Sequence, residues 1–147
     1  MTWQAIRVGI IGTGRISDLH AIEYIQNPFS QISALCDQDL DLATARAEKW
    51  GCPDAAVTNN YEDLLARDDV DLVELLLPHN MHLPIALKAI EAKKIISLQK
   101  PMCINLDEAD QLVAAAEASP HPFKVFENFI FHPTVMKAKA LIDEGAI

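Results

Sequence analysis

Cysteine is scarce in this chain of 147 residues, which contains only Cys36, Cys52 and Cys103. The number is odd and no two of the three have CxxC spacing, so neither a disulfide framework nor a cysteine-based zinc site is indicated. We interpret all three as buried free thiols in a reducing compartment.

Basic residues are also few, because 12 Lys and Arg face 21 Asp and Glu, giving a formal net charge of −9. This excess of negative charge would repel a nucleic acid, so none is expected as a partner. No apolar run approaches the roughly 18 residues of a membrane span, and the first ten residues lack the cationic and apolar regions of a signal peptide. We therefore expect a cytoplasmic protein with no membrane partner.

The length fits one domain on the usual scale of about 100 to 200 residues per domain. Half of the residues are hydrophobic and 22% are charged, which is typical of a globular chain. A domain of this size can bury enough apolar surface to fold without disulfides.

Short apolar runs alternate with helical patterns along the sequence. The expected strands cover 5–11, 31–36, 57–58, 70–77, 95–98 and 123–127. The expected helices run from 16 to the Asn27-Pro28 stop and over 39–50, 61–67, 81–92, 105–119 and 133–144. This alternation predicts an α/β, Rossmann-type doubly wound fold, with a mostly parallel sheet of about six strands and helices on both faces. Such sheets bind ligands beyond the carboxyl ends of their strands, beside the first strand.

A glycine turn follows the first strand and has the form G-x-G-x-x-S. Its residues are Gly12, Thr13, Gly14, Arg15, Ile16 and Ser17. In a dinucleotide fingerprint Gly12 permits the tight turn, Gly14 lets the pyrophosphate approach the backbone, and the small Ser17 allows close helix packing. The alternative is a plain glycine turn without a ligand.

Asp37 ends the second strand, 25 residues after Gly12. An acidic residue about 20 residues along binds the adenosine ribose hydroxyls in dinucleotide-binding folds. No Lys or Arg stands between Asp37 and Arg46 to meet a 2′-phosphate, which favours NAD over NADP as the cofactor. The alternative is a turn or helix-cap role for Asp37, which Asp39 could equally fill.

Polar residues also follow the later strands. These segments are Pro78-His79-Asn80-Met81-His82, Gln99-Lys100-Pro101 and Glu127-Asn128. Because parallel strands end at one edge of the sheet, we expect all three segments to lie at the edge that carries the glycine turn.

Taken together, these motifs resemble the N-terminal domain of the glucose-fructose oxidoreductase/inositol dehydrogenase/MocA (Gfo/Idh/MocA) family. The family hallmarks are a G-x-G-x-x-[AGS] loop, a T-P-N-x-x-H stretch and an E-K-P motif. Residues 8–17, 78–82 and 94–101 match them in order and spacing, and 127–133 is similar to the segment after the last nucleotide-domain strand. The resemblance covers the whole chain.

The resemblance implies roles for individual residues. Lys100 would be a catalytic residue that contacts the substrate near the nicotinamide and assists proton movement. His82 would be catalytic or lie beside the cofactor, with a packing or capping role as its alternative. The further cofactor-binding residues implied are Leu77, Pro78, Asn80, Gln99 and Asn128.

Several residues depart from the family pattern. Gln99 stands where Glu is common and could not act as a carboxylate, Leu77 and His79 replace Thr and Asn, and Ile130 stands where Arg is frequent. Glu74 lies in an apolar strand, where an ionised carboxylate needs a partner that the sequence does not identify. A metal at His79-x-x-His82 is not expected, because hydride transfer needs none.

We expect residues 1–130 to form an NAD(P)-binding domain, and 131–147 a helix leading to a substrate domain absent from this chain. The whole protein would transfer a hydride between the cofactor and a sugar, inositol or related polyol, and this chain alone would be an inactive fragment. The alternative is a non-catalytic dinucleotide-binding module, an NAD sensor or partner subunit. Phe129, Ile130, Phe131, Leu141, Ile142 and Ile147 would then lack cover, which favours a homo-oligomer.

Overall fold

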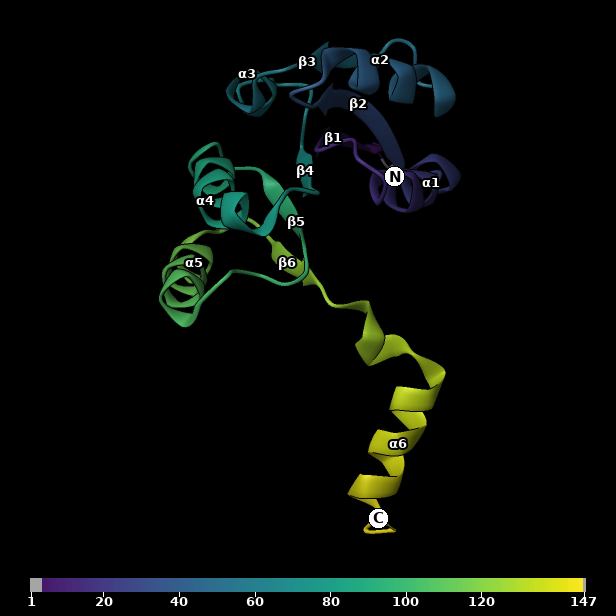
Figure 1. Ribbon diagram of the computed structural model, residues 1–147, viewed down its shortest axis with the longest axis vertical. Helices are drawn as coiled ribbons and strands as arrows, with labels where there is room; N and C mark the ends of the chain where they lie inside the picture. Colours follow the sequence, from purple (N-terminus) through teal and green to yellow (C-terminus); the bar gives the residue numbers. More distant parts are fainter. Residues whose placement is uncertain (1–3, 147) are drawn as a thin grey trace.

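The computed structural model describes residues 4–146 and is a single twisted sheet with helices on both faces (Figure 1). Its strands are β1 (Ile6–Ile11), β2 (Ser30–Cys36), β3 (Ala56–Thr58), β4 (Leu72–Leu75), β5 (Ile95–Gln99) and β6 (Phe123–Phe126). They pair in the order β3-β2-β1-β4-β5-β6, and every pairing is parallel. This is the Rossmann order with its reversal beside β1, so the expected fold class is confirmed.

Each strand is followed by a helical segment. The helices are α1 (Ser17–Gln26), α2 (Leu40–Lys49), α3 (Tyr61–Leu65), α4 (His82–Glu91), α5 (Leu106–Ala118) and α6 (Pro133–Asp143), with short 3₁₀ turns η1 (His79–Met81) and η2 (Asn128–Phe131). The N-termini of four helices are capped by side chains that accept from main-chain N–H groups. Asp39 accepts from Leu42, Asn60 from Glu62, Asn105 from Glu108 and His132 from Thr134. Such caps satisfy N–H groups that have no partner within the helix.

Two hydrophobic clusters pack on opposite faces of the sheet. Helices α3, α4 and α5 cover one face, where Leu64, Ile85 and Leu112 meet the inward side chains of β4 and β5. Helix α1 and helix α2 cover the other face through residues such as Ala21 and Ala47 (Figure 1). The central strands are therefore buried on both sides, which explains why their sequences are almost continuously apolar.

Strand β4 is shorter than the expected run of 70–77. The main chain of Leu76 still donates to Ile11, with the nitrogen and oxygen 2.9 Å apart, but the chain then leaves the sheet. Pro78 precedes η1 and cannot donate to a strand ladder. The residues after Leu75 therefore leave the sheet and form the edge of the candidate site.

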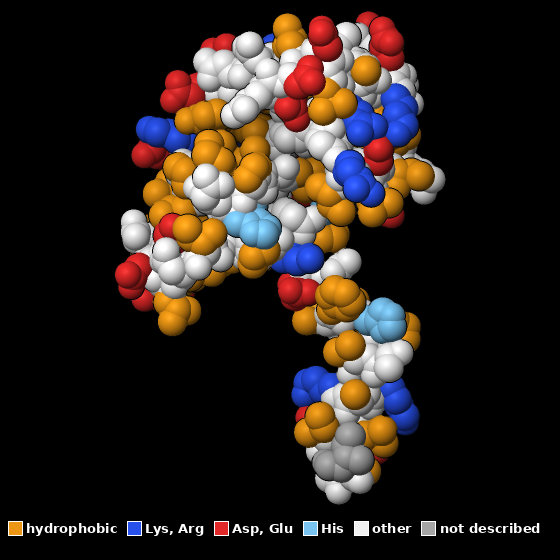
Figure 2. All heavy atoms as spheres, in the orientation of Figure 1, with side chains coloured by type: hydrophobic (Ala, Val, Ile, Leu, Met, Phe, Trp, Pro, Cys, Tyr) orange, Lys and Arg blue, Asp and Glu red, His pale blue; other side chains and the backbone are white. Residues whose placement is uncertain are grey.

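The C-terminal segment extends away from the sheet (Figure 1). No residue of α6 is buried, and hydrophobic side chains lie on the surface of this arm (Figure 2). Phe129, Phe131 and Ile142 are each about 60% exposed and Ile130 is 56% exposed, so their expected lack of cover is confirmed. Leu141 is half-buried, and Ile147 lies outside the described residues.

All three cysteines are free thiols, as expected, but only Cys36 is fully buried. Burial, with a smaller contribution from the carboxylates of Asp37 and Asp63, raises the pKa of the Cys36 thiol to about 11. Cys52 and Cys103 are half-buried, so the expectation of complete burial was wrong for these two.

Candidate functional site

The glycine turn leaves β1 at the carboxyl edge of the sheet. Gly12 has φ +97°, and a Cβ placed there would collide with the carbonyl oxygen of Leu76. At Gly14 a Cβ would meet no atom within 4 Å, so that residue borders open space. Ser17 is buried and its hydroxyl donates to the Gly14 carbonyl, 2.5 Å away. Gly12 is therefore required by the fold, whereas Gly14 leaves room for a ligand.

Asp37 holds this turn against the end of β2. Its Oδ2 accepts from the Thr13 N–H at 2.7 Å and from the Thr13 hydroxyl at 3.0 Å, and its Oδ1 accepts from the Asp39 N–H at 3.1 Å. A carboxylate offers about four acceptor positions, so these three donors leave about one free for a ligand. Asp39 separately caps α2 through Leu42.

The first cation after Asp37 in the sequence, Arg46, is already engaged. Its Nε donates to the Thr13 carbonyl at 3.1 Å, and its Nη1 forms an ion pair with Asp18 at 2.8 Å. Asp18 also accepts from Lys49 and Trp50, and hydrogen bonds from these two are the leading causes that lower the pKa of its carboxyl group. Arg46 therefore braces the turn from α2.

Two cavities flank the glycine turn. The first, which we call the β2-side cavity, has a volume of about 500 Å³. Predicted site residues in its lining are Gly12, Gly14, Asp37, Leu77 and Pro78. The loop after β3 contributes Asn59 and Asn60 to the same lining, and α3 contributes its first residue, Tyr61.

The second cavity, which we call the β5-side cavity, has a volume of about 610 Å³. Its lining includes the predicted residues Ile16, Gln99, Lys100 and Asn128. Lys100 is exposed, and its main-chain N–H donates to Gln99 Oε1 at 2.8 Å. Of the remaining predicted residues, Thr13 and Ser17 are buried, and Arg15 and Asn80 are exposed outside both linings.

His82 does not reach either cavity. It is 0% exposed, with Nε2 3.0 Å from the Leu77 carbonyl oxygen and Nδ1 2.9 Å from that of Pro101. Both ring nitrogens thus face main-chain carbonyl oxygens, and a neutral imidazole can donate to one of them. In this position the ring joins Leu77, just after β4, to the turn that follows Lys100, which fits the packing alternative, and the catalytic role of His82 stays a prediction.

A polar cluster that was not predicted from the sequence lies beneath the β5-side cavity. Glu74 of β4 is 0% exposed, and its Oε2 accepts from the Tyr24 hydroxyl of α1 at 2.5 Å. Its Oε1 lies 3.0 Å from His20 Nδ1, although the ring N–H is not aligned for a hydrogen bond. His20 Nε2 in turn lies 2.9 Å from Gln99 Nε2. The sequence contains one signal for this cluster. His20 and Tyr24 are four residues apart and therefore lie on the same face of a helix.

The pKa of the Tyr24 phenol is strongly affected by these neighbours. Burial first, and the neighbouring Glu74 carboxylate second, raise the pKa of the Tyr24 phenol well above its usual range. The phenol therefore stays protonated and acts as a donor to Glu74. His20 also packs against Phe126 of β6, with ring centroids 5.0 Å apart.

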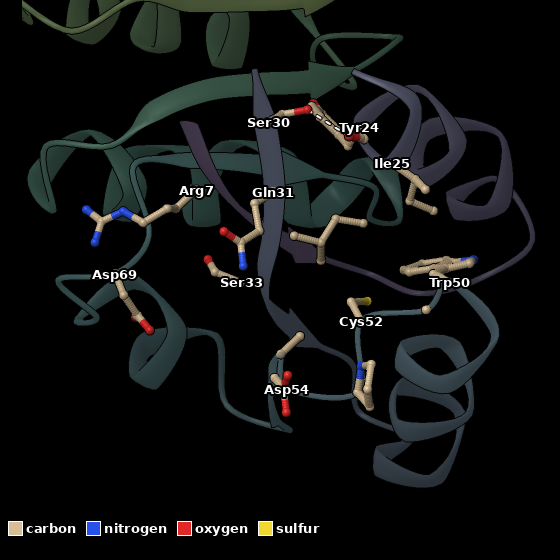
Figure 3. Close-up of a pocket in the computed structure, with 14 residues that line it drawn as sticks. Arg7, Tyr24, Ile25, Ser30, Gln31, Ser33, Trp50, Cys52, Asp54 and Asp69 are labelled. Atoms are coloured by element: carbon tan, nitrogen blue, oxygen red, sulfur yellow. Dashed lines mark hydrogen bonds between the residues drawn. The ribbon is translucent and has the colours of Figure 1, made fainter. Parts of the chain in front are cut away.

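A third hollow lies among the earlier residues of β2 and is lined by Arg7, Gln31, Ser33, Trp50, Cys52 and Asp69 (Figure 3). We call it the amino-edge hollow. Two of its charged residues are already paired within the protein, because Arg7 forms a salt bridge with Asp71 and Asp69 forms one with Arg67. Ligands of open α/β sheets bind at the opposite edge.

Comparison with known proteins places the whole arrangement in a family. The sequence profile of the Gfo/Idh/MocA oxidoreductase family, NAD-binding Rossmann fold, matches residues 6–126. The chain belongs to the Gfo/Idh/MocA family. The resemblance inferred from the motifs is thereby confirmed, and the family is one of nicotinamide dinucleotide-binding oxidoreductases.

Individual members of the Gfo/Idh/MocA family are moderately similar. An uncharacterized oxidoreductase of Bacillus subtilis, YrbE, is 32% identical over 149 aligned residues, covering 100% of this chain and 42% of YrbE. KijD10, a 3-ketoreductase from Actinomadura kijaniata in complex with NADP and TDP-benzene, has a TM-score of 0.87 and 28% identity, covering 98% of this chain and 44% of KijD10.

The scyllo-inositol dehydrogenase of Lactobacillus casei has a TM-score of 0.89 at 22% identity, covering 100% of this chain and 44% of the dehydrogenase, and this likeness concerns the fold. The chain therefore spans less than half the length of each of these three proteins.

Within residues 4–146, no helix is long and apolar enough to cross a membrane. In the same residues, no group of three or more His, Cys, Asp or Glu side chains is arranged to hold a metal ion.

Proposed function

We propose that this chain is the cofactor-binding part of an oxidoreductase that transfers a hydride between a nicotinamide dinucleotide and a sugar, inositol or related polyol. The observation that carries this proposal is the pair of cavities at the glycine turn, one lined by Gly12 and Gly14 and the other by Ile16. Dinucleotides bind across the crevice where the strand order reverses, which here is beside β1.

The orientation of the dinucleotide follows from the two linings. Asp37 belongs to the β2-side cavity and is the acidic residue expected at the adenosine ribose. The pyrophosphate would lie over Gly14 at the start of α1, where main-chain N–H groups and the helix dipole favour negative charge. The nicotinamide half would therefore occupy the β5-side cavity with Gln99, Lys100 and Asn128.

Lys100 is the residue we assign to the reaction itself. When bound, the cofactor supplies the hydride acceptor or donor. The exposed ammonium of Lys100 would polarise the reacting oxygen and stabilise negative charge that develops on it. Gln99 and His82 would hold Lys100 in place, since they bind its main-chain N–H and the carbonyl of the next residue, Pro101.

NAD is the cofactor we propose, with NADP disfavoured. The carboxylate of Asp37 would repel a 2′-phosphate, and Arg46 is committed to Asp18 and to the Thr13 carbonyl. The NADP in the KijD10 complex belongs to a protein that is 28% identical to this one and does not determine the choice here.

Calorimetric titration of the chain with NADH and NADPH tests this proposal. We expect the native chain to bind NADH more tightly than NADPH. Asp37→Ala should weaken the binding of NADH and should narrow or reverse the preference for NADH over NADPH. Asp39→Ala is the matched control, because it removes a nearby carboxylate that caps α2 and lies outside the β2-side cavity lining. Unchanged NADH affinity in Asp37→Ala, with no gain for NADPH, would contradict the assignment of Asp37.

A further inference from the structure

Asp18, in the first turn of α1, accepts hydrogen bonds from three side chains at the end of α2. Its Oδ1 accepts from Arg46 Nη1 at 2.9 Å, from Lys49 Nζ at 2.8 Å and from Trp50 Nε1 at 2.9 Å. Its Oδ2 accepts from Arg46 Nη1 at 2.8 Å. Because the pKa of Asp18 is lowered, the group is ionised near neutral pH. This one carboxylate therefore compensates the charge of both Arg46 and Lys49.

Arg46 also contacts the residue that Asp37 binds. Its Nε donates to the Thr13 carbonyl at 3.1 Å, and the N–H of the same Thr13 donates to Asp37 Oδ2 at 2.7 Å. Asp37 is the residue that we assign to the adenosine ribose, whose 2′-hydroxyl carries the extra phosphate in NADP. A single residue of the glycine turn therefore separates the guanidinium of Arg46 from the carboxylate that would meet the 2′ position.

Arg46 has the chemistry that a 2′-phosphate requires. An arginine accommodates this phosphate in NADP-binding folds, because a planar guanidinium donates two parallel hydrogen bonds to phosphate oxygens. Here the guanidinium faces Asp18 instead. The Arg46 side chain is only 16% exposed, and Arg46 does not belong to the lining of the β2-side cavity. A 2′-phosphate would therefore have to compete with Asp18 for this cation.

We propose that Asp18 is a determinant of cofactor preference, because it holds Arg46 away from the 2′ position of the adenosine ribose. This inference rests on the proposed function, since it assumes that the adenosine half of a nicotinamide dinucleotide binds in the β2-side cavity. With Asp18 present, NADPH meets the carboxylate of Asp37 while Arg46 is engaged elsewhere. Without Asp18, the flexible side chain of Arg46 turns toward the 2′-phosphate. Opposite unit charges about 10 Å apart, at an effective dielectric constant of about 20, change a binding constant by about tenfold.

The test is the ratio of the dissociation constants for NADPH and NADH, measured by calorimetry on the chain with Asp18→Asn. An asparagine side chain has one acceptor oxygen and no charge, so it cannot hold the donors of Arg46, Lys49 and Trp50 together. We expect the NADPH-to-NADH ratio to fall about tenfold through tighter NADPH binding, while the affinity for NADH changes less than about twofold. An unchanged ratio, or an equal change in both affinities, would overturn the proposal.

Two double variants identify the cation that is responsible. Asp18→Asn combined with Arg46→Gln should return the ratio to the native value, because the released guanidinium is then absent. Asp18→Asn combined with Lys49→Gln is the matched control, since Lys49 pairs with the same carboxylate but is 57% exposed, and it should keep the lowered ratio. A lowered ratio that survives Arg46→Gln would show that another cation, such as the exposed Arg15, or the lost charge of Asp18 itself acts on the phosphate, which would contradict the proposal.

A measurement on the native chain decides the matter even if Asp18→Asn fails to fold. The Arg46 Nε–H group gives a signal of its own in the ¹⁵N-labelled chain, and its loss in Arg46→Gln assigns it. We expect NADH and NADPH to shift this signal equally, because Arg46 stays on Asp18 in both complexes. A shift that NADPH produces and NADH does not would mean that Arg46 already binds the 2′-phosphate in the native chain, and would refute the inference.

The binding measurements also separate this inference from the proposed function. If the native chain binds neither NADH nor NADPH, the proposed function itself fails. A native preference for NADPH would contradict both the proposed choice of NAD and the role of Asp18. If the native chain prefers NADH and Asp18→Asn leaves that preference unaltered, the present inference alone is refuted.

Discussion

Alanine substitutions at Gly12 and Gly14 should separate the requirements of the fold from those of the ligand. The two glycines are two residues apart in one turn, yet their surroundings differ. At Gly12 an added Cβ would overlap the main chain of Leu76, whereas at Gly14 it would face open space. The same methyl group therefore meets protein at one position and the proposed pyrophosphate site at the other.

The cost at Gly12 has two sources. A non-glycine residue held at φ +97° is strained by about 1–3 kcal/mol. Overlap with a carbonyl in a packed interior adds about 1–3 kcal/mol, because Leu76 is itself held by its hydrogen bond to Ile11. We expect Gly12→Ala to lose about 3–5 kcal/mol of unfolding free energy, a large part of the about 5–15 kcal/mol typical of a domain.

Gly14→Ala should leave the free energy of unfolding within about 1 kcal/mol of the native value, and can raise it by restricting the unfolded chain. Its affinity for NADH should fall at least about tenfold, equivalent to about 1.4 kcal/mol. Urea denaturation and calorimetric titration of both variants measure the two effects separately. A stable Gly12→Ala variant, or a Gly14→Ala variant with native NADH affinity, would refute this reasoning.

Three further predictions concern stability and association. Asp18→Asn should destabilise the domain at pH 7 by about 1 kcal/mol, discounted for the partial exposure of this carboxylate. Because the pKa of Asp18 is lowered from 3.8, its contribution is present above about pH 4 and is lost as the pH falls through the lowered value, so denaturation curves of variant and native chain should converge in acid. His82→Phe should cost about 1–3 kcal/mol of unfolding free energy, because a neutral imidazole donates to one of the two carbonyl groups it faces and phenylalanine donates to neither, and an unchanged urea midpoint would contradict the contacts of this ring. Changing Phe129 and Phe131 together to Ser should lower the dimer population in sedimentation at several concentrations, whereas a native chain that is monomeric throughout would contradict self-association.

Most of the fold could be predicted from the sequence because its signals are local. The apolar runs, the stop at Asn27-Pro28 and the caps at Asp39 and Asn105 mark where elements begin and end. Parallel strands also bring their ends to one edge, so the glycine turn, Asp37 and Lys100 could be assigned to that edge in advance.

The parts that could not be predicted depend on how far each strand pairs and on the direction in which individual side chains point. The stretch 70–77 has the composition of one long strand, but only Leu72–Leu75 pairs in the sheet. The motif containing His82 gave no sign that its ring faces main-chain carbonyls rather than a cavity. Glu74 was recognised as needing a partner, but which side chains of α1 approach it depends on the rotation of that helix over the sheet.

The central claim is that one dinucleotide spans both cavities at the carboxyl edge, and amide chemical shifts of the ¹⁵N-labelled chain test it most directly. ADP-ribose should shift the amides of Gly14 and Asp37 while leaving the β5-side cavity unchanged. NAD⁺ should shift the same amides and, in addition, those of Gln99, Lys100 and Asn128. Shifts confined to the amino-edge hollow, or an identical pattern for the two ligands, would contradict the account.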